Sequence, residues 1–276
     1  MIAARLLDPV RRQWFSEEST LALRSKQFIA TVMPESVLLG LKKRYYLGLL
    51  KRDGDDRMET DARALPLLVH PGDFVIDVGA FVGFYTQRLS RLVGPGGVVW
   101  SFEPMPHTFD ILTTAVRELR LSNVRTLPYA LSDSVGAATM EVPRYKGGGE
   151  SWWDAKIVEG SQRPDYRHVE IARRTLDLLL SDNTRPVAFI KIDAEFHELH
   201  CVRGAMDSLR RWHPVVQVEM LGNVDDPNSD VFATVDLLAS LGYTPHHFDG
   251  SHFHQRRRGE TQQNLFFFSA EHRNIL

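Results

Sequence analysis

The feature that most constrains the fold is an alternation of short apolar runs with amphipathic segments, which begins at Gly72 and continues almost to the C-terminus. Such alternation is typical of strands and helices in a mostly parallel sheet that helices cover on both faces. Strands are expected at 74–78, 98–102, 124–129, 187–192 and 215–218, and helices at 83–92, 109–119, 195–211 and 231–241. The sequence therefore predicts an α/β domain.

The C-terminal end of this pattern differs from the rest. Residues 243–248 and 264–269 are consecutive apolar runs with no helical segment between them. Two strands joined in this way are antiparallel, so the prediction is a mostly parallel seven-stranded sheet that ends in an antiparallel hairpin. Between the third and fourth strands, a polar stretch that includes 147–149 and 152–153 is interpreted as a loop or a small hairpin excursion.

The N-terminal part of the chain has a different texture. Residues 1–64 are rich in Leu, Arg and Lys, and residues 34–52 have apolar side chains at helical spacing. We expect a helical N-terminal arm over 1–64, a linker at 53–56 and an α/β domain over 65–276. The arm helix is expected to pack on the domain. A lid over the site, a homodimer contact and a weak membrane contact through residues 34–52 are alternatives.

Composition excludes several classes of protein. The net charge is −2, which gives no overall field toward nucleic acid or an anionic bilayer. The single cysteine, Cys201, cannot form an internal disulfide or a cysteine metal cluster. Apolar runs are too short to span a bilayer. We expect a cytoplasmic protein with a small-molecule partner and no nucleic-acid partner.

Polar residues and glycines follow the first two predicted strands. Asp77, Gly79 and Gly83 lie at the end of the first strand, and Glu103 and Pro104 follow the second. Ligands of open α/β sheets bind outside the carboxyl ends of the strands, and a carboxylate there suits the two hydroxyl groups of a ribose. A dinucleotide fingerprint requires three glycines, and Phe81 occupies the place of the second. The sequence therefore predicts a nucleoside site without a diphosphate.

Six motifs in this order resemble the FkbM family of methyltransferases. They are VIDVGAFVGFYT (75–86), FEPMP (102–106), YALSD (129–133), RTLDLLL (174–180), IKIDAEFHE (190–198) and VVQVEM (215–220). The resemblance extends from about residue 73 to residue 268 and implies a Rossmann-like class I methyltransferase fold that uses S-adenosylmethionine. Such enzymes methylate hydroxyl groups of sugars, glycolipids or macrolide-type natural products.

The resemblance also implies roles for individual residues. The cofactor-binding set would be Asp77, Gly79, Phe81, Gly83, Tyr85, Glu103, Pro104, Ala130, Leu131, Ser132 and Asp193, with 130–132 along the adenine. The chain departs from the family at Phe81, where Asn is usual, and at Phe196, where the family pattern has Gly. His197 adds an imidazole beside Phe196. We therefore expect a specialised acceptor side.

Catalytic candidates cluster after the fourth and fifth predicted strands: Lys191, Asp193, Glu195, His197 and Glu219. Asp193 is expected to hold the amino end of the cofactor or to orient the acceptor. His197 is the preferred general base because the pKa of an unperturbed imidazole lies near neutrality. Asp193, Glu195 and Glu219, with His197, also offer ligands for Mg²⁺ or a similar hard cation.

Three hypotheses follow for the function. The first is an O-methyltransferase that acts on a sugar or a glycosylated small molecule. The second is an O-methyltransferase of a polyketide or another non-sugar natural product, and the third is a non-catalytic scaffold that binds S-adenosylmethionine. In the loop 246–258, Arg256, Arg257 and Arg258 are expected to favour an anionic acceptor, and Trp152 and Trp153 either stack on a sugar or are buried.

Overall fold

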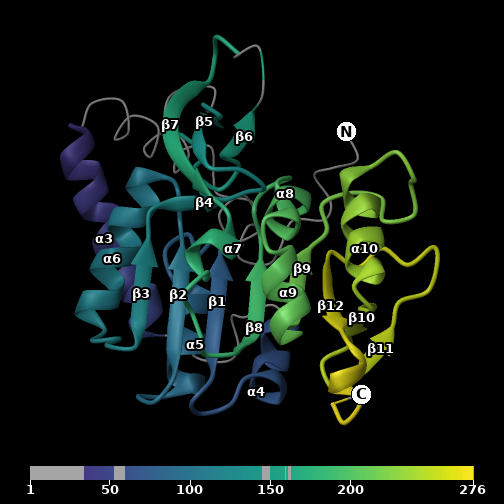
Figure 1. Cartoon of the computed structure of the whole chain (residues 1–276). Coiled ribbons are helices and arrows are strands. Elements are labelled where there is room, and N and C mark those ends of the chain that lie inside the picture. Colours follow the sequence, from purple (N-terminus) through teal and green to yellow (C-terminus); the bar gives the residue numbers. More distant parts are fainter. Residues whose placement is uncertain (1–33, 53–59, 145–149, 159, 161–162, 276) are drawn as a thin grey trace.

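The structure of the protein is a computed structural model that describes residues 34–52, 60–144, 150–158, 160 and 163–275. Its main sheet consists of β1 Phe74–Val78, β2 Val98–Phe102, β3 Val124–Leu127, β8 Val187–Ile192, β9 Val215–Glu219, β10 Thr244–Phe248, β11 Phe253–Gln255 and β12 Asn264–Phe268. The strand order is β11-β10-β12-β9-β8-β1-β2-β3 (Figure 1). From β9 to β3 the strands are parallel, whereas β12, β10 and β11 pair in antiparallel fashion.

This arrangement confirms the predicted α/β class, with a mostly parallel sheet and an antiparallel C-terminal hairpin. The predicted number of seven strands is corrected to eight. The additional strand, β11, lies within the loop 246–258 and pairs with β10 at the edge of the sheet. Sequence reasoning missed it because a short edge strand with polar residues lacks the apolar run that marks a central strand.

Helices cover both faces of the main sheet. Their bounds are α4 Leu65–Leu68, α5 Phe84–Val93, α6 Pro106–Glu118, α7 Leu176–Leu179, α8 Glu198–Arg203, α9 Met206–Trp212 and α10 Asp230–Ser240. On one face, Val202, Leu209 and Leu238 of α8, α9 and α10 pack with Ile76 and Ile190 of the sheet. On the other, α4 and α5 pack on the alternate strand residues. Burial on both faces explains why these strands are continuous apolar runs in the sequence.

A second sheet lies beyond the carboxyl ends of the parallel strands (Figure 1). Its strands are β4 Tyr129–Leu131, β5 Gly136–Val142, β6 Lys156–Val158 and β7 Arg167–Arg174, in the order β4-β7-β5-β6. The expected small hairpin is part of a larger structure: β5 and β6 pair in antiparallel fashion, but the four-stranded sheet to which they belong was not predicted. The predicted strand 124–129 is likewise divided between β3 and β4, which belong to different sheets. Strands that are only partly buried give a weak apolar pattern.

The predicted helix over 195–211 is also corrected, because it forms two helices after a turn. Glu195 and Phe196 have φ values of 49° and 74°, so the chain is not helical there. The break between α8 and α9 follows Gly204, where a β-carbon would lie 1.9 Å from the carbonyl oxygen of Ser132. Only glycine allows this close approach of two backbones.

The helix α3 Glu35–Lys51 packs against α6. Tyr46 and Leu50 form its buried side, and the side chain of Gln87 donates a hydrogen bond to the carbonyl oxygen of Leu50. Val37 and Leu41, which the spacing places on the core-facing stripe, are instead more than 40% exposed. The helix therefore packs on the domain through a face other than the predicted one.

The boundary between arm and domain at residue 64 stays a prediction. The 3-10 helix η3 Thr60–Ala64 precedes α4, and its Ala62 and Ala64 are buried among core residues of the main sheet. The predicted linker 53–56 and the glycines 147–149 lie outside the described residues. Among the helices that the structure describes, none is long and apolar enough to cross a membrane.

Candidate active site

A cavity of about 570 Å³ opens at the carboxyl ends of the parallel strands, and residues of both sheets line it. Ten residues of the predicted site are among the lining residues: Gly79, Phe81, Glu103, Pro104, Ala130, Leu131, Asp193, Glu195, His197 and Glu219. Five others do not line it, namely Asp77, Gly83, Tyr85, Ser132 and Lys191. The structure therefore brings most of the predicted residues to one place and leaves a smaller group beneath it.

That smaller group includes part of a polar row across the main sheet. Ser101, Asp77, Lys191 and Gln217 are neighbours in register on β2, β1, β8 and β9. All four are at least 95% buried. Each lies two positions after an apolar residue of the face that α5 covers, so its side chain points to that same face.

Hydrogen bonds connect this row to α5 and to the cavity. The hydroxyl group of Thr86 lies 2.6 Å from Oδ2 of Asp77 and donates to it, and Lys191 Nζ lies 3.9 Å from Oδ1. Burial raises the pKa of Asp77, and the nearby Lys191 ammonium opposes that shift. Lys191 Nζ also donates to Oδ2 of Asp193 at 3.1 Å. Asp77 and Lys191 thus support the cavity floor from below.

Tyr85 takes part in the same support. Lys191 Nζ lies 4.6 Å from the centre of the Tyr85 ring, and the side chain of Gln217 donates to the Tyr85 hydroxyl group over 3.2 Å. A cation above an aromatic face is stabilised by the ring quadrupole.

Glu103 lines the cavity at the end of β2. Its Oε1 accepts hydrogen bonds from the N–H of Met105 (3.0 Å) and the hydroxyl group of Thr108 (2.7 Å), and its Oε2 accepts one from the N–H of Phe81 (2.8 Å). Burial raises the pKa of Glu103 to about 7, although these hydrogen bonds oppose the shift. A carboxylate has about four lone-pair sites, so Glu103 retains capacity to accept a hydrogen bond from a ligand.

Gly79 is required for a reason that the sequence does not show. Its φ is +72°, and a β-carbon there would lie 1.8 Å from the carbonyl oxygen of Asp193. The space above this glycine is therefore filled by the backbone that follows β8, not left for a ligand. Gly83 also has a left-handed φ of +103°, and a β-carbon there would touch Leu112.

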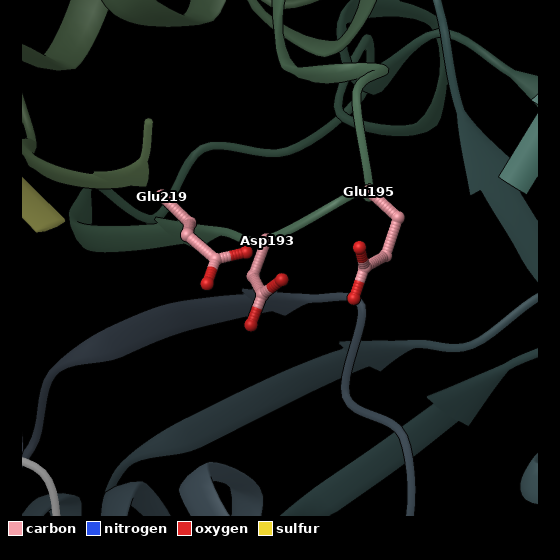
Figure 2. Close-up of side chains that lie close together, drawn as sticks. All are labelled: Asp193, Glu195 and Glu219. Carbon is pink, nitrogen blue, oxygen red and sulfur yellow. The ribbon is translucent and has the colours of Figure 1, made fainter. Parts of the chain in front are cut away.

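The turn after β8 and the end of β9 bring three carboxylates together. One oxygen from each of Asp193, Glu195 and Glu219 lies within 4.8 Å of the other two, and we call these residues the acidic triad (Figure 2). The buried side chain of Glu198 holds the turn, because its Oε1 accepts the N–H groups of Ala194 (3.0 Å) and Phe196 (3.2 Å). Burial raises the pKa of Glu198 to about 7.

A sequence family matches this arrangement. The Methyltransferase FkbM domain matches residues 77–245, which is more than half of the 276 residues. The chain belongs to the FkbM methyltransferase family. The matched range begins at Asp77 in β1 and ends within β10, and it includes the acidic triad and Glu103.

Solved structures are similar to this FkbM methyltransferase only distantly. The methyltransferase FkbM from Methylobacillus flagellatus KT is 14% identical with a TM-score of 0.48, over 84% of this chain and 60% of that one. An O-methyltransferase from Bacillus cereus in complex with SAH is 15% identical with a TM-score of 0.46, over 87% and 94%. This chain thus spans 60% of the length of the first relative. No curated protein has significant sequence similarity to it.

The residues of the cavity fit S-adenosylmethionine, the cofactor that the resemblance to this family implies. Five carboxylates and no Lys or Arg are among the described lining residues; the carboxylates belong to Asp61, Glu103, Asp193, Glu195 and Glu219. The cofactor has a positive sulfonium and a positive ammonium group, which negative side chains stabilise. Glu103 offers a hydrogen-bond acceptor for its ribose.

His197 lies on the cavity beside the segment predicted to follow the adenine. Its Nε2 is 3.0 Å from the hydroxyl oxygen of Ser132, and its ring stacks on that of His200, with centroids 4.4 Å apart. Burial and, to a smaller extent, the neighbouring His200 lower the pKa of His197 to about 4. The general-base role of His197 stays a prediction, and these surroundings do not favour it, because an imidazole of so low a pKa is a weak proton acceptor.

The arginines of loop 246–258 were expected to favour an anionic acceptor. This expectation is wrong for Arg256. Its guanidinium donates to both oxygens of Asp225, at 2.9 and 3.0 Å, and its side chain is 8% exposed. This bidentate pair fixes the loop rather than a ligand. Within the loop, it is His247 and Phe248 that line the cavity.

Sequence reasoning missed one wall of the cavity. Thr60 and Asp61 from η3 and residues 261–264 before and at the start of β12 line it beside Glu219. Burial raises the pKa of Asp61 to about 6, and a hydrogen bond with the Asn264 side chain opposes the shift. No motif marks these residues, but residues just before a strand that pairs with β9 lie at the same sheet edge as Glu219, and that topological signal was available.

Proposed function

We propose that this methyltransferase transfers a methyl group to a hydroxyl group of a sugar, of a glycosylated small molecule or of a glycolipid. The observation that carries the proposal is the division of the cavity into two unlike walls. One wall offers carboxylate and amide groups from Asp61, Glu219 and residues 262–264, and the other is aromatic and apolar, with Phe81, Trp152 and Trp153. Sugars present hydroxyl groups at their edges and an apolar face, so they complement both walls.

S-adenosylmethionine, when bound, supplies an electrophilic methyl group on a sulfonium sulfur. The residues of this chain align the acceptor and take up its proton. We assign Glu103 to the ribose hydroxyl groups, Ala130 and Leu131 to the adenine, and Asp193 to the amino end of the cofactor. The assignment to Asp193 is supported by Lys191, which holds the Asp193 carboxylate at 3.1 Å.

The acceptor hydroxyl group requires a proton acceptor within hydrogen-bond reach. Glu195 and Glu219 are candidates in addition to His197, since both are partly exposed to the cavity and lie in the acidic triad. Replacement of the true base should lower turnover about 10²- to 10⁴-fold. Comparison of His197→Ala, Glu195→Gln and Glu219→Gln would identify it, because only one of the three is expected to show a loss of that size with unchanged cofactor affinity.

Mg²⁺ at the acidic triad stays a prediction. Three carboxylates this close repel one another, and Lys191 already provides one compensating positive charge at Asp193. Oxygen ligands of this kind suit a hard cation. Loss of turnover after exhaustive EDTA treatment, with recovery on addition of Mg²⁺, would support a metal; full turnover after EDTA would exclude a requirement for one.

The experiment that tests the proposed function follows the transfer of an isotopically labelled methyl group from S-adenosylmethionine to matched pairs of glycosides and their aglycones. Mass spectrometry and NMR of the product identify the methylated atom. Methylation of the sugar hydroxyl groups supports the proposal. Labelling of the aglycone alone indicates the non-sugar natural-product alternative, and cofactor binding without transfer to any acceptor indicates a scaffold.

A homodimer stays a prediction that sedimentation would test.

A further inference from the structure

Two phenylalanines at the active site have left-handed backbone conformations. The φ angle is 49° at Phe81 and 74° at Phe196. A bulky residue in this region is an outlier, because its β-carbon approaches the following carbonyl group. Such conformations persist where the surrounding structure holds them, and they concentrate at functional sites. We therefore looked for contacts of the two rings that hold these conformations.

Both rings contact one short segment of the second sheet. The centroids of the Phe81 and Trp153 rings are 3.9 Å apart, and Lys156 Nζ lies 5.2 Å from the centre of the Phe196 ring. Trp153 and Lys156 belong to residues 152–158, which end in β6 and which we call the roof segment. Side chains of the roof segment line the cavity, including Trp152, Trp153 and Ile157.

The start of the roof segment is fixed to the helical layer beside it. Lys42 Nζ of α3 lies 3.2 Å from the centre of a Trp152 ring, and the His107 ring of α6 is parallel to Trp152 at 4.8 Å. Tyr46 of α3 in turn contacts Phe81 edge to face, with centroids 5.9 Å apart. Contacts of these kinds are attractive. The other end of the segment belongs to β6, which pairs with β5 so that Lys156 lies opposite Glu141, and Phe196 contacts this end through Lys156.

We propose that Phe81 and Phe196 are positioning residues that hold the roof segment over the bound cofactor. Phe81 holds it from inside the cavity through Trp153, and Phe196 holds it from outside through Lys156. A fixed roof excludes water from the reacting groups and slows the release of ligand. The inference rests on the proposed function only in taking this cavity as the place of methyl transfer.

Phe196 allows the sharper test of the two. Phe81 lines the cavity, so its replacement changes ligand contacts directly. Phe196 does not line the cavity and is 58% exposed, so an effect on bound ligand has to pass through the roof segment. Its exposure also means that the variant retains the core. Phe196→Gly accepts the left-handed conformation without a β-carbon, and Phe196→Tyr keeps the ring.

The dissociation rate of S-adenosylhomocysteine, measured by stopped flow, tests the proposal. We expect Phe196→Gly and Lys156→Ala each to raise this rate by a factor of about 2 to 5, as loss of an exposed cation–π contact allows, and Phe196→Tyr to leave it unchanged. The ligand should dissociate from the double variant no faster than from either single variant, because both substitutions remove the same contact. Arg120→Gly is the matched control, since Arg120 also has a left-handed φ, of 55°, at the end of α6.

Unchanged dissociation from Phe196→Gly, or multiplied effects in the double variant, would overturn the proposal. Acrylamide quenching of tryptophan fluorescence in ligand-free protein gives a second readout, and it should increase in Phe196→Gly but not in Arg120→Gly. If the wild-type protein does not bind S-adenosylhomocysteine, the use of the cavity for this cofactor is refuted. The quenching comparison alone then decides whether Phe196 holds the roof segment.

Discussion

The backbone N–H of Phe81 donates a hydrogen bond of 2.8 Å to Oε2 of Glu103. This contact joins the turn after β1 to the end of β2 and orients the carboxylate that we assign to the cofactor ribose. Thr108, in the first turn of α6, binds the other carboxylate oxygen at 2.7 Å. The orientation of Glu103 is thus set before any ligand arrives, which lowers the entropy lost on binding.

Replacement of Glu103 should weaken cofactor binding strongly. Glu103→Ala removes charge-assisted hydrogen bonds worth about 1.5–3 kcal/mol, which corresponds to an affinity loss of about 10- to 100-fold. Calorimetric titration with S-adenosylhomocysteine measures it. Glu118→Ala, at the exposed C-terminal end of α6, serves as the control and should bind normally. Equal affinity of the two variants would rule out the ribose assignment.

Cofactor affinity should also depend on pH through Glu103. Burial raises the pKa of this carboxyl group to about 7, so its acceptor form is fully present only above that pH. Affinity for S-adenosylhomocysteine should therefore increase as the pH rises toward 7.5, and below the pKa it should fall by about tenfold per pH unit. Glu103→Gln does not titrate and should bind with a flat profile. A slope that persists in this variant would assign the pH dependence to another group.

Gly79→Ala should destabilise the protein more than an alanine at a comparable glycine. A β-carbon at Gly79 would lie 1.8 Å from the Asp193 carbonyl oxygen, whereas one at Gly72, also left-handed, would meet nothing within 4 Å. Gly72→Ala should cost only the backbone strain, about 1–2 kcal/mol, and Gly79→Ala should cost about 1–3 kcal/mol in addition. Urea denaturation measures both, and equal losses would contradict the close approach of β1 and β8.

His197 should make the protein less stable in acid. Burial lowers the pKa of His197 in the folded protein to about 4, below its ordinary value of 6.5. The unfolded chain therefore binds this proton first as the pH falls, and the contribution present above about pH 6.5 is lost toward pH 4. Relative to His197→Gln, the wild-type free energy of unfolding should fall by about 2 kcal/mol between pH 7.5 and pH 5.

The wild type has to be compared with His197→Gln because other buried groups change the free energy of unfolding in the opposite direction as the pH falls. Burial raises the pKa values of Glu103, Glu198 and Asp61, so these carboxyl groups favour the folded state in acid. They are present in both proteins and cancel in the difference. A pH-independent difference would show that His197 ionises normally in the folded protein.

The core of the fold was predictable because its strands are buried on both faces. The bounds of β1, β2 and β8 agree with the apolar runs in the sequence, and the carboxyl ends of these strands then fix where Glu103 and Asp193 lie. The second sheet was not predictable in this way. In β7, charged residues alternate weakly with apolar ones, since most of its side chains are only partly buried.

Site residues were predictable where their place follows from the end of a strand, and were not predictable where it follows from the packing of side chains. The acidic triad follows from strand ends, whereas the separation of Asp77 and Lys191 from the cavity follows from the side to which alternate strand residues point. The left-handed conformations of Phe81 and Phe196 could not be predicted, because phenylalanine is a poor indicator of such backbone. Asp61 reaches the site only through the packing of η3 beneath β10 and β12.

The cavity wall formed by η3 and the segment before β12 has a practical consequence. Asp61, His247 and residues 261–264 all line the cavity, yet they lie outside the range 77–245 that defines membership of the family. Under the proposed function this wall belongs to the acceptor side, so family membership and substrate choice are encoded in different stretches of this chain. We therefore expect relatives that agree over the shared range to differ in what they methylate.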